Sequence, residues 1–146
     1  MKKQDCWYKN VCTYDSCTNC IRYVEMKYLL DTSCIPKSKQ YPQELIADVD
    51  LDAYCKLADI KSDIVEFVEM GSNVFICSQN TGNGKTSWAI KLMLRYFNEV
   101  WAGNGFKVRG LFVNVPTLLL QLKNFDNPLP EEFKQHLMDV DLDRKS

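Results

Sequence analysis

The chain has 146 residues, of which 46% are hydrophobic, 12% aromatic and 25% charged, and its formal net charge is −1. This composition is ordinary for a soluble globular protein and argues against intrinsic disorder. Because no run of residues approaches the ~20 apolar positions that a bilayer span needs, and because the first residues are polar rather than an apolar secretion signal, we expect a cytoplasmic protein that does not bind membranes.

The amino-terminal part of the chain is rich in cysteine. Four thiols lie close together at Cys6, Cys12, Cys17 and Cys20, and Cys34 follows. Zn²⁺ takes four thiolates in a tetrahedral site, and a closely spaced pair such as Cys17 and Cys20 forms a typical half-site. The pattern predicts a structural zinc site with these four ligands, in which Cys34 could replace any one of them. The alternatives are free structural cysteines or, in an oxidising compartment, disulfides.

A polar stretch with two prolines, residues 35–44, follows the cysteines and reads as a connector. Beyond it, apolar residues recur every three to four positions, which is the spacing of one helical face. The stripe consists of Leu51, Tyr54, Leu57, Ile60 and Ile64. A polar break near residues 59–62 predicts two short helices rather than one, and Gly71 predicts their end.

The most informative stretch is a short apolar run followed by a glycine-containing loop. Residues 73–78 (NVFICS) are apolar on both faces, as buried parallel strands are, and the loop Gly82-Asn83-Gly84-Lys85-Thr86-Ser87 leads into a predicted helix. Strand, loop and helix in this order are the context of a phosphate-binding P-loop. Glycines let successive backbone N–H groups converge on an anion, and the helix N-terminus adds unpaired N–H groups and its positive dipole end.

The loop residues have distinct predicted roles in binding a nucleoside triphosphate. We expect Lys85 to reach the β- and γ-phosphates, Thr86 to offer its hydroxyl to Mg²⁺, and Ser87 to cover the α-phosphate. The complete motif begins with a further glycine, and this chain has Gln79 there. The loop geometry or the nucleotide affinity is therefore expected to differ from the usual. The alternative interpretation is a chance match in a surface turn.

The segments after the loop alternate between helix and strand. Apolar residues on one side predict a helix over residues 86–101, which Gly103-Asn104-Gly105 ends. Residues 111–115 (LFVNV) predict a second strand, and further helices are expected over residues 117–125 and 130–140. Strand, loop, helix, strand and helix form the opening of a parallel β-α-β sheet.

These elements together predict an α/β fold with three parts. Residues 1–40 are expected to form a small cysteine-rich zinc-binding module, and residues 41–72 a helical connector. Residues 73–146 are expected to form the first part of a P-loop NTPase core, an AAA+-like parallel sheet with helices.

Residues 44–146 resemble the DnaC/DnaI/IstB-like replicative helicase loaders, which are AAA+ P-loop ATPases, and in particular the phage-borne members of that family. The resemblance covers about two-thirds of the chain. It rests on residues 73–78, on the loop of residues 82–87, on the helix with Trp88, Tyr96 and Phe97, and on residues 111–119 (LFVNVPTLL).

The resemblance implies an ATP-binding DNA replication factor that uses ATP and Mg²⁺, engages a replicative helicase or single-stranded DNA, and forms a homo-oligomer when complete. It also implies a later strand with paired acidic residues, the Walker B element, which orders Mg²⁺ and the attacking water. The chain ends at Ser146, about where that strand should begin, and no arginine finger can be assigned. We therefore expect a truncated segment that binds a nucleotide better than it hydrolyses one. Some members similarly carry an N-terminal zinc module that contacts the helicase.

Two other functions fit parts of the sequence. A small P-loop kinase would need an arginine-bearing lid, but residues 103–146 contain only Arg109 and Arg144. A non-enzymatic interaction protein would instead use the cysteine module to bind a partner and would carry a vestigial nucleotide loop.

Overall fold

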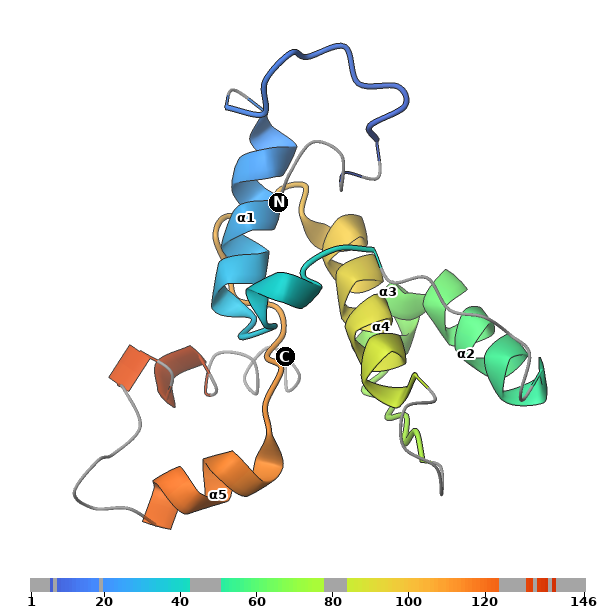
Figure 1. Ribbon diagram of the computed structural model, residues 1–146, viewed down its shortest axis with the longest axis vertical. Helices are drawn as coiled ribbons and strands as arrows, with labels where there is room; N and C mark the ends of the chain where they lie inside the picture. Colours follow the sequence, from blue (N-terminus) through green and yellow to red (C-terminus); the bar gives the residue numbers. More distant parts are fainter. Residues whose placement is uncertain are drawn as a thin grey trace.

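In the computed structural model, the chain folds into helices joined by turns and extended segments (Figure 1). The structure describes residues 6, 8–18, 20–42, 51–77, 84–123, 131–132, 134–136 and 138. In chain order the elements are α1 (Ile21–Thr32), the short 3-10 helix η2 (Lys37–Lys39), α2 (Leu51–Ser62), α3 (Ile64–Glu69), α4 (Lys85–Val100) and α5 (Val115–Lys123). With 16 residues, α4 is the longest of these, and the core is built around it.

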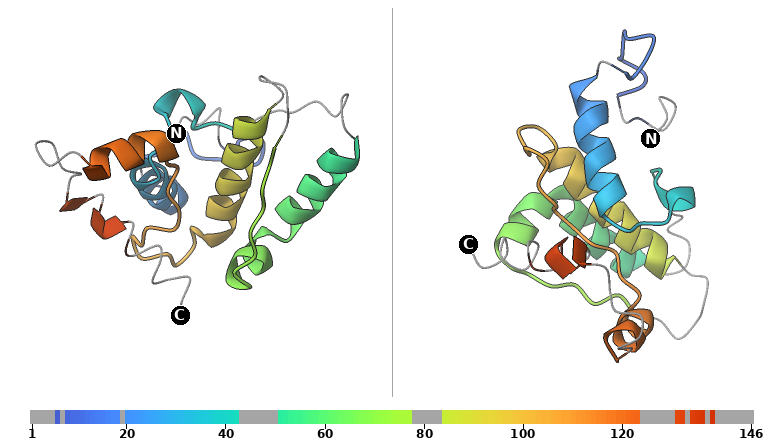
Figure 2. Two further views of the ribbon diagram at one scale, coloured as in Figure 1. Left: turned by 90° about the horizontal axis from the view of Figure 1, so that it is seen from below. Right: turned by 90° about the vertical axis from the view of Figure 1, so that its left-hand side faces the viewer.

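Helix α4 lies between α1 on one side and α2 with α3 on the other (Figure 1; Figure 2). It can do so because apolar residues at helical spacing cover two of its faces. The face towards α1 contributes to a buried cluster of Met26, Leu29, Leu30, Ile35, Ile90, Leu94 and Phe97. The other face contributes to a cluster of Leu57, Ile64, Trp88 and Leu92. Burying each large apolar side chain stabilises the fold by about 1.5–3 kcal/mol, so α4 is held from both sides.

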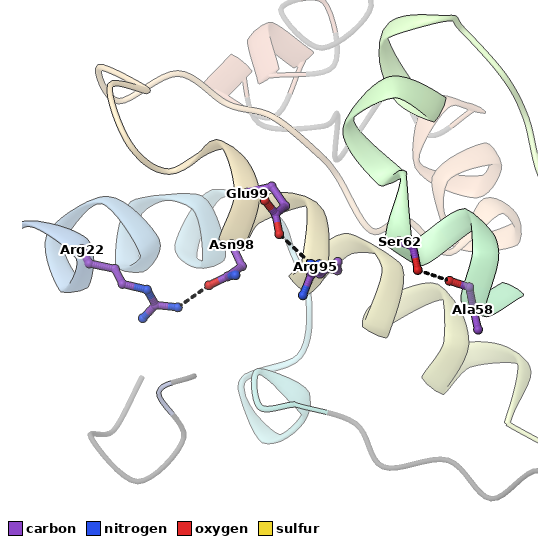
Figure 3. A network of polar contacts seen from close by, with 6 residues as sticks. All are labelled: Arg22, Ala58, Ser62, Arg95, Asn98 and Glu99. Carbon is purple, nitrogen blue, oxygen red and sulfur yellow. Dashed lines mark hydrogen bonds and ion pairs between the residues drawn. The ribbon is translucent and has the colours of Figure 1, made fainter. Parts of the chain in front are cut away.

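A buried polar contact also joins α1 to α4 (Figure 3). Arg22 Nη2 donates a hydrogen bond of 2.7 Å to Asn98 Oδ1, and the two side chains are 6% and 8% exposed. The same guanidinium donates to Cys6 Sγ at 3.1 Å and lies 4.9 Å from the centre of the Tyr8 ring. These contacts compensate for the removal of a charged group from water.

The two helices before the loop confirm the pattern read from the sequence. The break predicted near residues 59–62 comes slightly later, at Asp63, between the end of α2 and the start of α3. At the end of α2, Ser62 Oγ donates to the carbonyl of Ala58 at 3.0 Å (Figure 3). Gly71 then adopts a positive φ of 69°, which a glycine tolerates, and the chain leaves the helical path as predicted.

The predicted parallel sheet is wrong for the part of the chain that the structure describes, where no residue is assigned to a strand. Residues 73–77 and 107–114 lie outside any helix or strand, and α5 begins at Val115. A strand requires a neighbouring segment that accepts and donates its backbone hydrogen bonds. Among the described residues, residues 73–77 make no such bond, and the N–H of Phe112 donates instead to the carbonyl of Ser33, at 2.6 Å.

The predicted zinc module is also wrong as a structural unit. Within the described residues, no three His, Cys, Asp or Glu side chains gather into a group that could hold a metal ion. Cys6 Sγ accepts a hydrogen bond from Arg22, and Cys20 precedes the first residue of α1 without capping the helix through its side chain. The predicted thiol ligands therefore do not converge on one point in the part of the chain that the structure describes. Cys12, Cys17 and Cys34 are free thiols.

The helices predicted after the loop are present. The helix expected over residues 86–101 is α4, and the one expected over residues 117–125 is α5, which begins two residues earlier. Of the last predicted helix, the described residues 131–132, 134–136 and 138 are helical. No residue of α5 is buried, although its side chains are largely apolar.

Candidate nucleotide-binding site

The start of α4 coincides with the phosphate-binding motif of the sequence. Gly84 is the residue before the helix and has φ 88° and ψ 13°, which is the left-handed conformation. The first helical hydrogen bond runs from the N–H of Trp88 to the carbonyl of Gly84, at 2.8 Å. A side chain at position 84 would be strained in this conformation, so the glycine is required where the chain turns into the helix.

The first turn of α4 is electropositive. It contains Lys85 and no acidic residue, and no side chain of the described residues caps it. The N–H groups of Thr86 and Ser87 have no acceptor within the helix, because the first turn of any helix lacks one. A lysine at the positive end of a helix dipole is unfavourable by roughly 0.3–1 kcal/mol. A bound anion would offset that effect, so the local sequence suits a phosphate.

Buried contacts hold this helix end in place. Trp88, one turn after Gly84, is 7% exposed and meets the ring of Tyr54 edge to face, with 5.4 Å between ring centres. The ammonium of Lys91 lies 5.5 Å from the centre of the Trp88 ring. Thr86 is exposed, and Lys85 and Ser87 are half-buried. Thr86 is therefore accessible to a ligand, and Lys85 and Ser87 are partly accessible, while the backbone from Gly84 onwards is held in place.

An apolar groove of about 690 Å³ runs along α4 from this end. Lys85 and Thr86 line its amino end, and α3, α4 and the segments at residues 74–76 and 109–113 form its floor and walls. Its charged lining residues are Lys85 and Arg109, and no carboxylate of the described chain faces it. Arg109 is steadied by a 2.7 Å hydrogen bond from its Nε to Oδ1 of Asn104, which is 1% exposed.

The predicted site residues are only partly within the described chain. Gly84, Lys85, Thr86 and Ser87 are consecutive at the start of α4, whereas Gly82 and Asn83 lie outside the described residues. Cys6, one of the predicted thiol ligands, lies near the opposite end of α4. Its sulfur accepts a hydrogen bond from Arg22, and Arg22 in turn donates to Asn98, which is close to the carboxyl end of the helix.

No sequence pattern predicted the groove or identified Arg109 as one of its lining residues. The loop that brings Arg109 there depends on positive φ angles at Gly103, Gly105 and Phe106 and on the buried Asn104 side chain, which donates to the carbonyl of Lys107 at 2.8 Å. The sequence predicted the turn at Gly103-Asn104-Gly105. It did not predict that the residues after this turn, 109–113, would line a groove beside α4.

The donor set fits Mg²⁺ only in combination with phosphate. Thr86 offers one hydroxyl, and no carboxylate lines the described part of the groove. Mg²⁺ commonly retains several waters and binds through substrate phosphates with few protein ligands. The described residues could therefore orient a magnesium–nucleotide complex through Thr86.

Comparison of the chain with models of protein families, with curated proteins and with solved structures found no match.

No helix in the described ranges is both long and apolar enough to cross a membrane.

Proposed function

We propose that this chain binds the triphosphate of ATP, together with Mg²⁺, at the amino end of α4. The observation that carries the proposal is the left-handed Gly84 followed at once by Lys85 and an uncapped helix. The N–H groups of Thr86 and Ser87 supply neutral donors to the phosphate oxygens, and Lys85 supplies the charge. The proposal rests on this local arrangement and does not require a parallel sheet.

Binding rather than hydrolysis is the activity that the described residues support. Phosphoryl transfer to water needs a group that positions the attacking water and further charges that stabilise the transition state. The groove next to Lys85 has no carboxylate among its described lining residues. We therefore propose that this chain binds a nucleotide.

Replacing Lys85 by alanine tests the binding site. Loss of a charge-assisted contact of about 1.5–3 kcal/mol should weaken binding of MgATP roughly 10- to 150-fold in isothermal titration calorimetry. Lys107→Ala is the matched control, because it removes the same charge from an exposed residue that does not line the groove. Equal affinity of both variants for MgATP would remove Lys85 from the site.

We further propose that nucleotide binding serves a DNA replication factor of the helicase-loader type. Its support is the resemblance of residues 73–78, 82–87 and 111–119 to that family. The expected partners are a replicative helicase and single-stranded DNA, with a homo-oligomer as the working form. Fluorescence anisotropy of a labelled oligothymidine should rise on addition of the protein, and more steeply with MgATP than without it. An anisotropy that stays constant in both conditions would count against the DNA-binding part of the proposal.

A further inference from the structure

We infer that the apolar groove along α4 holds the base and ribose of the nucleotide, an inference that rests on the phosphate site proposed above. The groove begins beside Lys85 and Thr86 and reaches Tyr96 and Phe97 on the same helix. At 1.5 Å per residue, the distance from Lys85 to Phe97 is about 18 Å along the helix axis. A ligand whose phosphates lie at the amino end of α4 therefore has room to lie along the helix.

The size and lining of the groove suit a small organic ligand. Its volume of about 690 Å³ falls within the ~300–1,000 Å³ that is typical of ligand pockets, which are mostly apolar and contain few polar groups. Of the aromatic side chains in its lining, Phe67, Tyr96 and Phe112 are half-buried and can meet a ligand, whereas Phe97 is fully buried in the core. A flat heteroaromatic base gains free energy by stacking on such side chains, whereas a bare polyphosphate gains nothing from them.

The walls of the groove offer backbone groups for the polar edge of a base. Among the described residues, Val74, Ile76, Gly110 and Leu111 make no backbone hydrogen bond. Unpaired backbone N–H and C=O groups beside an apolar surface are costly unless a partner or water satisfies them. A base has both donors and acceptors on its edge and can pair with them, which a purely apolar ligand cannot do.

Two cationic side chains line the groove and suit the anionic end of a ligand. Lys85 and Arg109 line it, and no carboxylate of the described residues faces it. A ligand with a flat apolar body and a polyanionic end matches this combination of groove and cations. A nucleoside triphosphate has this chemistry, whereas inorganic tripolyphosphate has only the anionic end.

The test compares MgATP with magnesium tripolyphosphate on the whole chain by isothermal titration calorimetry. The inference predicts that the wild-type chain binds MgATP about fivefold or more tightly than magnesium tripolyphosphate, because stacking of one base contributes about 1–3 kcal/mol. The Lys85→Ala substitution should weaken the binding of both ligands. Equal affinity of the wild-type chain for the two ligands would overturn the groove assignment and leave the phosphate site intact.

Ala89→Leu is designed to narrow the groove while leaving the residues of the proposed phosphate site, Gly84 to Ser87, unchanged. Ala89 lines the groove one turn after Lys85, and leucine is a good helix former. The Ala89→Leu variant should lose the preference for MgATP, while its affinity for tripolyphosphate should stay within about twofold of the wild-type value. Ala58→Leu makes the same change on α2, outside the groove, and should keep the preference.

A second filling variant, Val113→Phe, approaches from the opposite wall and makes the result independent of the folding of Ala89→Leu. It should abolish the preference in the same way. A preference for MgATP that survives in both folded variants would overturn the assignment of the base to the groove. If neither ligand binds the wild-type chain, the phosphate site itself is wrong and the groove assignment falls with it.

Discussion

The ring of Trp88 meets the ring of Tyr54 edge to face, at 5.4 Å between centres and an interplanar angle of 75°. This contact joins α4 to α2 one helical turn after Gly84, the residue at which the proposed phosphate site begins. Edge-to-face pairs contribute about 0.5–1.5 kcal/mol beyond the area that they bury. The stability of the helix end and the geometry of the site are therefore coupled through one side chain.

Truncation of Trp88 should be among the most damaging changes in the chain. Trp88→Ala removes a buried ring and leaves a cavity, which typically costs about 3–5 kcal/mol. Tyr54→Leu removes the edge-to-face geometry but keeps an apolar side chain, and should cost about 0.5–1.5 kcal/mol. Urea unfolding followed by circular dichroism measures both changes. A Trp88→Ala variant within about 1 kcal/mol of wild type would be inconsistent with its place in the core.

Comparing Gly84→Ala with Gly103→Ala should distinguish the effect of backbone strain on stability from an effect on ligand binding. Gly84 and Gly103 both have positive φ, 88° and 70°, so either replacement by alanine should destabilise the fold by about 1–2 kcal/mol. Only Gly84→Ala changes the entry to α4, so only this variant should also weaken MgATP binding. Comparable loss of affinity in Gly103→Ala would indicate a general effect of instability instead.

The buried contact between Arg22 and Asn98 gives a third prediction. Asn98→Ala leaves the guanidinium buried without one of its acceptors, and a hydrogen bond to a charged group is worth about 1.5–3 kcal/mol. The free energy of unfolding should fall by that amount in urea titrations. Asn73→Ala, at an exposed residue that makes no hydrogen bond among those described, is the control and should change stability by less than about 0.5 kcal/mol. Similar losses in the two variants would show that the Arg22–Asn98 bond is not formed in solution.

The pKa of Cys34 predicts a weak dependence of stability on alkaline pH. Partial burial raises the pKa of this thiol above its ordinary value. A group whose pKa is higher in the folded state stabilises the fold below its unfolded pKa, and that contribution is lost as the pH rises through the folded pKa. The free energy of unfolding of the wild-type chain should therefore fall more steeply above the ordinary thiol pKa of ~8.5 than that of Cys34→Ser. Parallel pH profiles would contradict this, and the effect is small because Cys34 is largely exposed.

The features that the sequence predicted correctly depend on local interactions. Apolar residues at helical spacing mark the buried faces of α2 and α3 whatever these helices pack against. Gly71 marks the end of α3 because few other residues accept its backbone conformation. The helix after the motif was predicted from the apolar spacing of α4, and it is present from Lys85 onwards.

The features that were missed or wrong depend on partners far along the chain. Residues 73–78 have the composition of a strand, but a strand also needs a paired neighbour, and the described chain supplies none. The contact between Arg22 and Asn98 joins residues 76 positions apart, which no local pattern reveals. The spacing of the cysteines likewise does not predict that Cys6 Sγ accepts a hydrogen bond from the guanidinium of Arg22. The groove arises only after α3, α4 and two extended segments have packed.

The amide spectrum of the isotopically labelled chain tests the central claim most directly. In a titration with MgATP monitored by ¹H–¹⁵N correlation spectra, the largest shifts should fall on the amides of Gly84, Lys85, Thr86 and Ser87, because these N–H groups are expected to meet the phosphates. Lys85→Ala should reduce the shifts at equal ligand concentration. Unchanged amides at the start of α4, or shifts confined to α5, would contradict the assignment of the phosphate site.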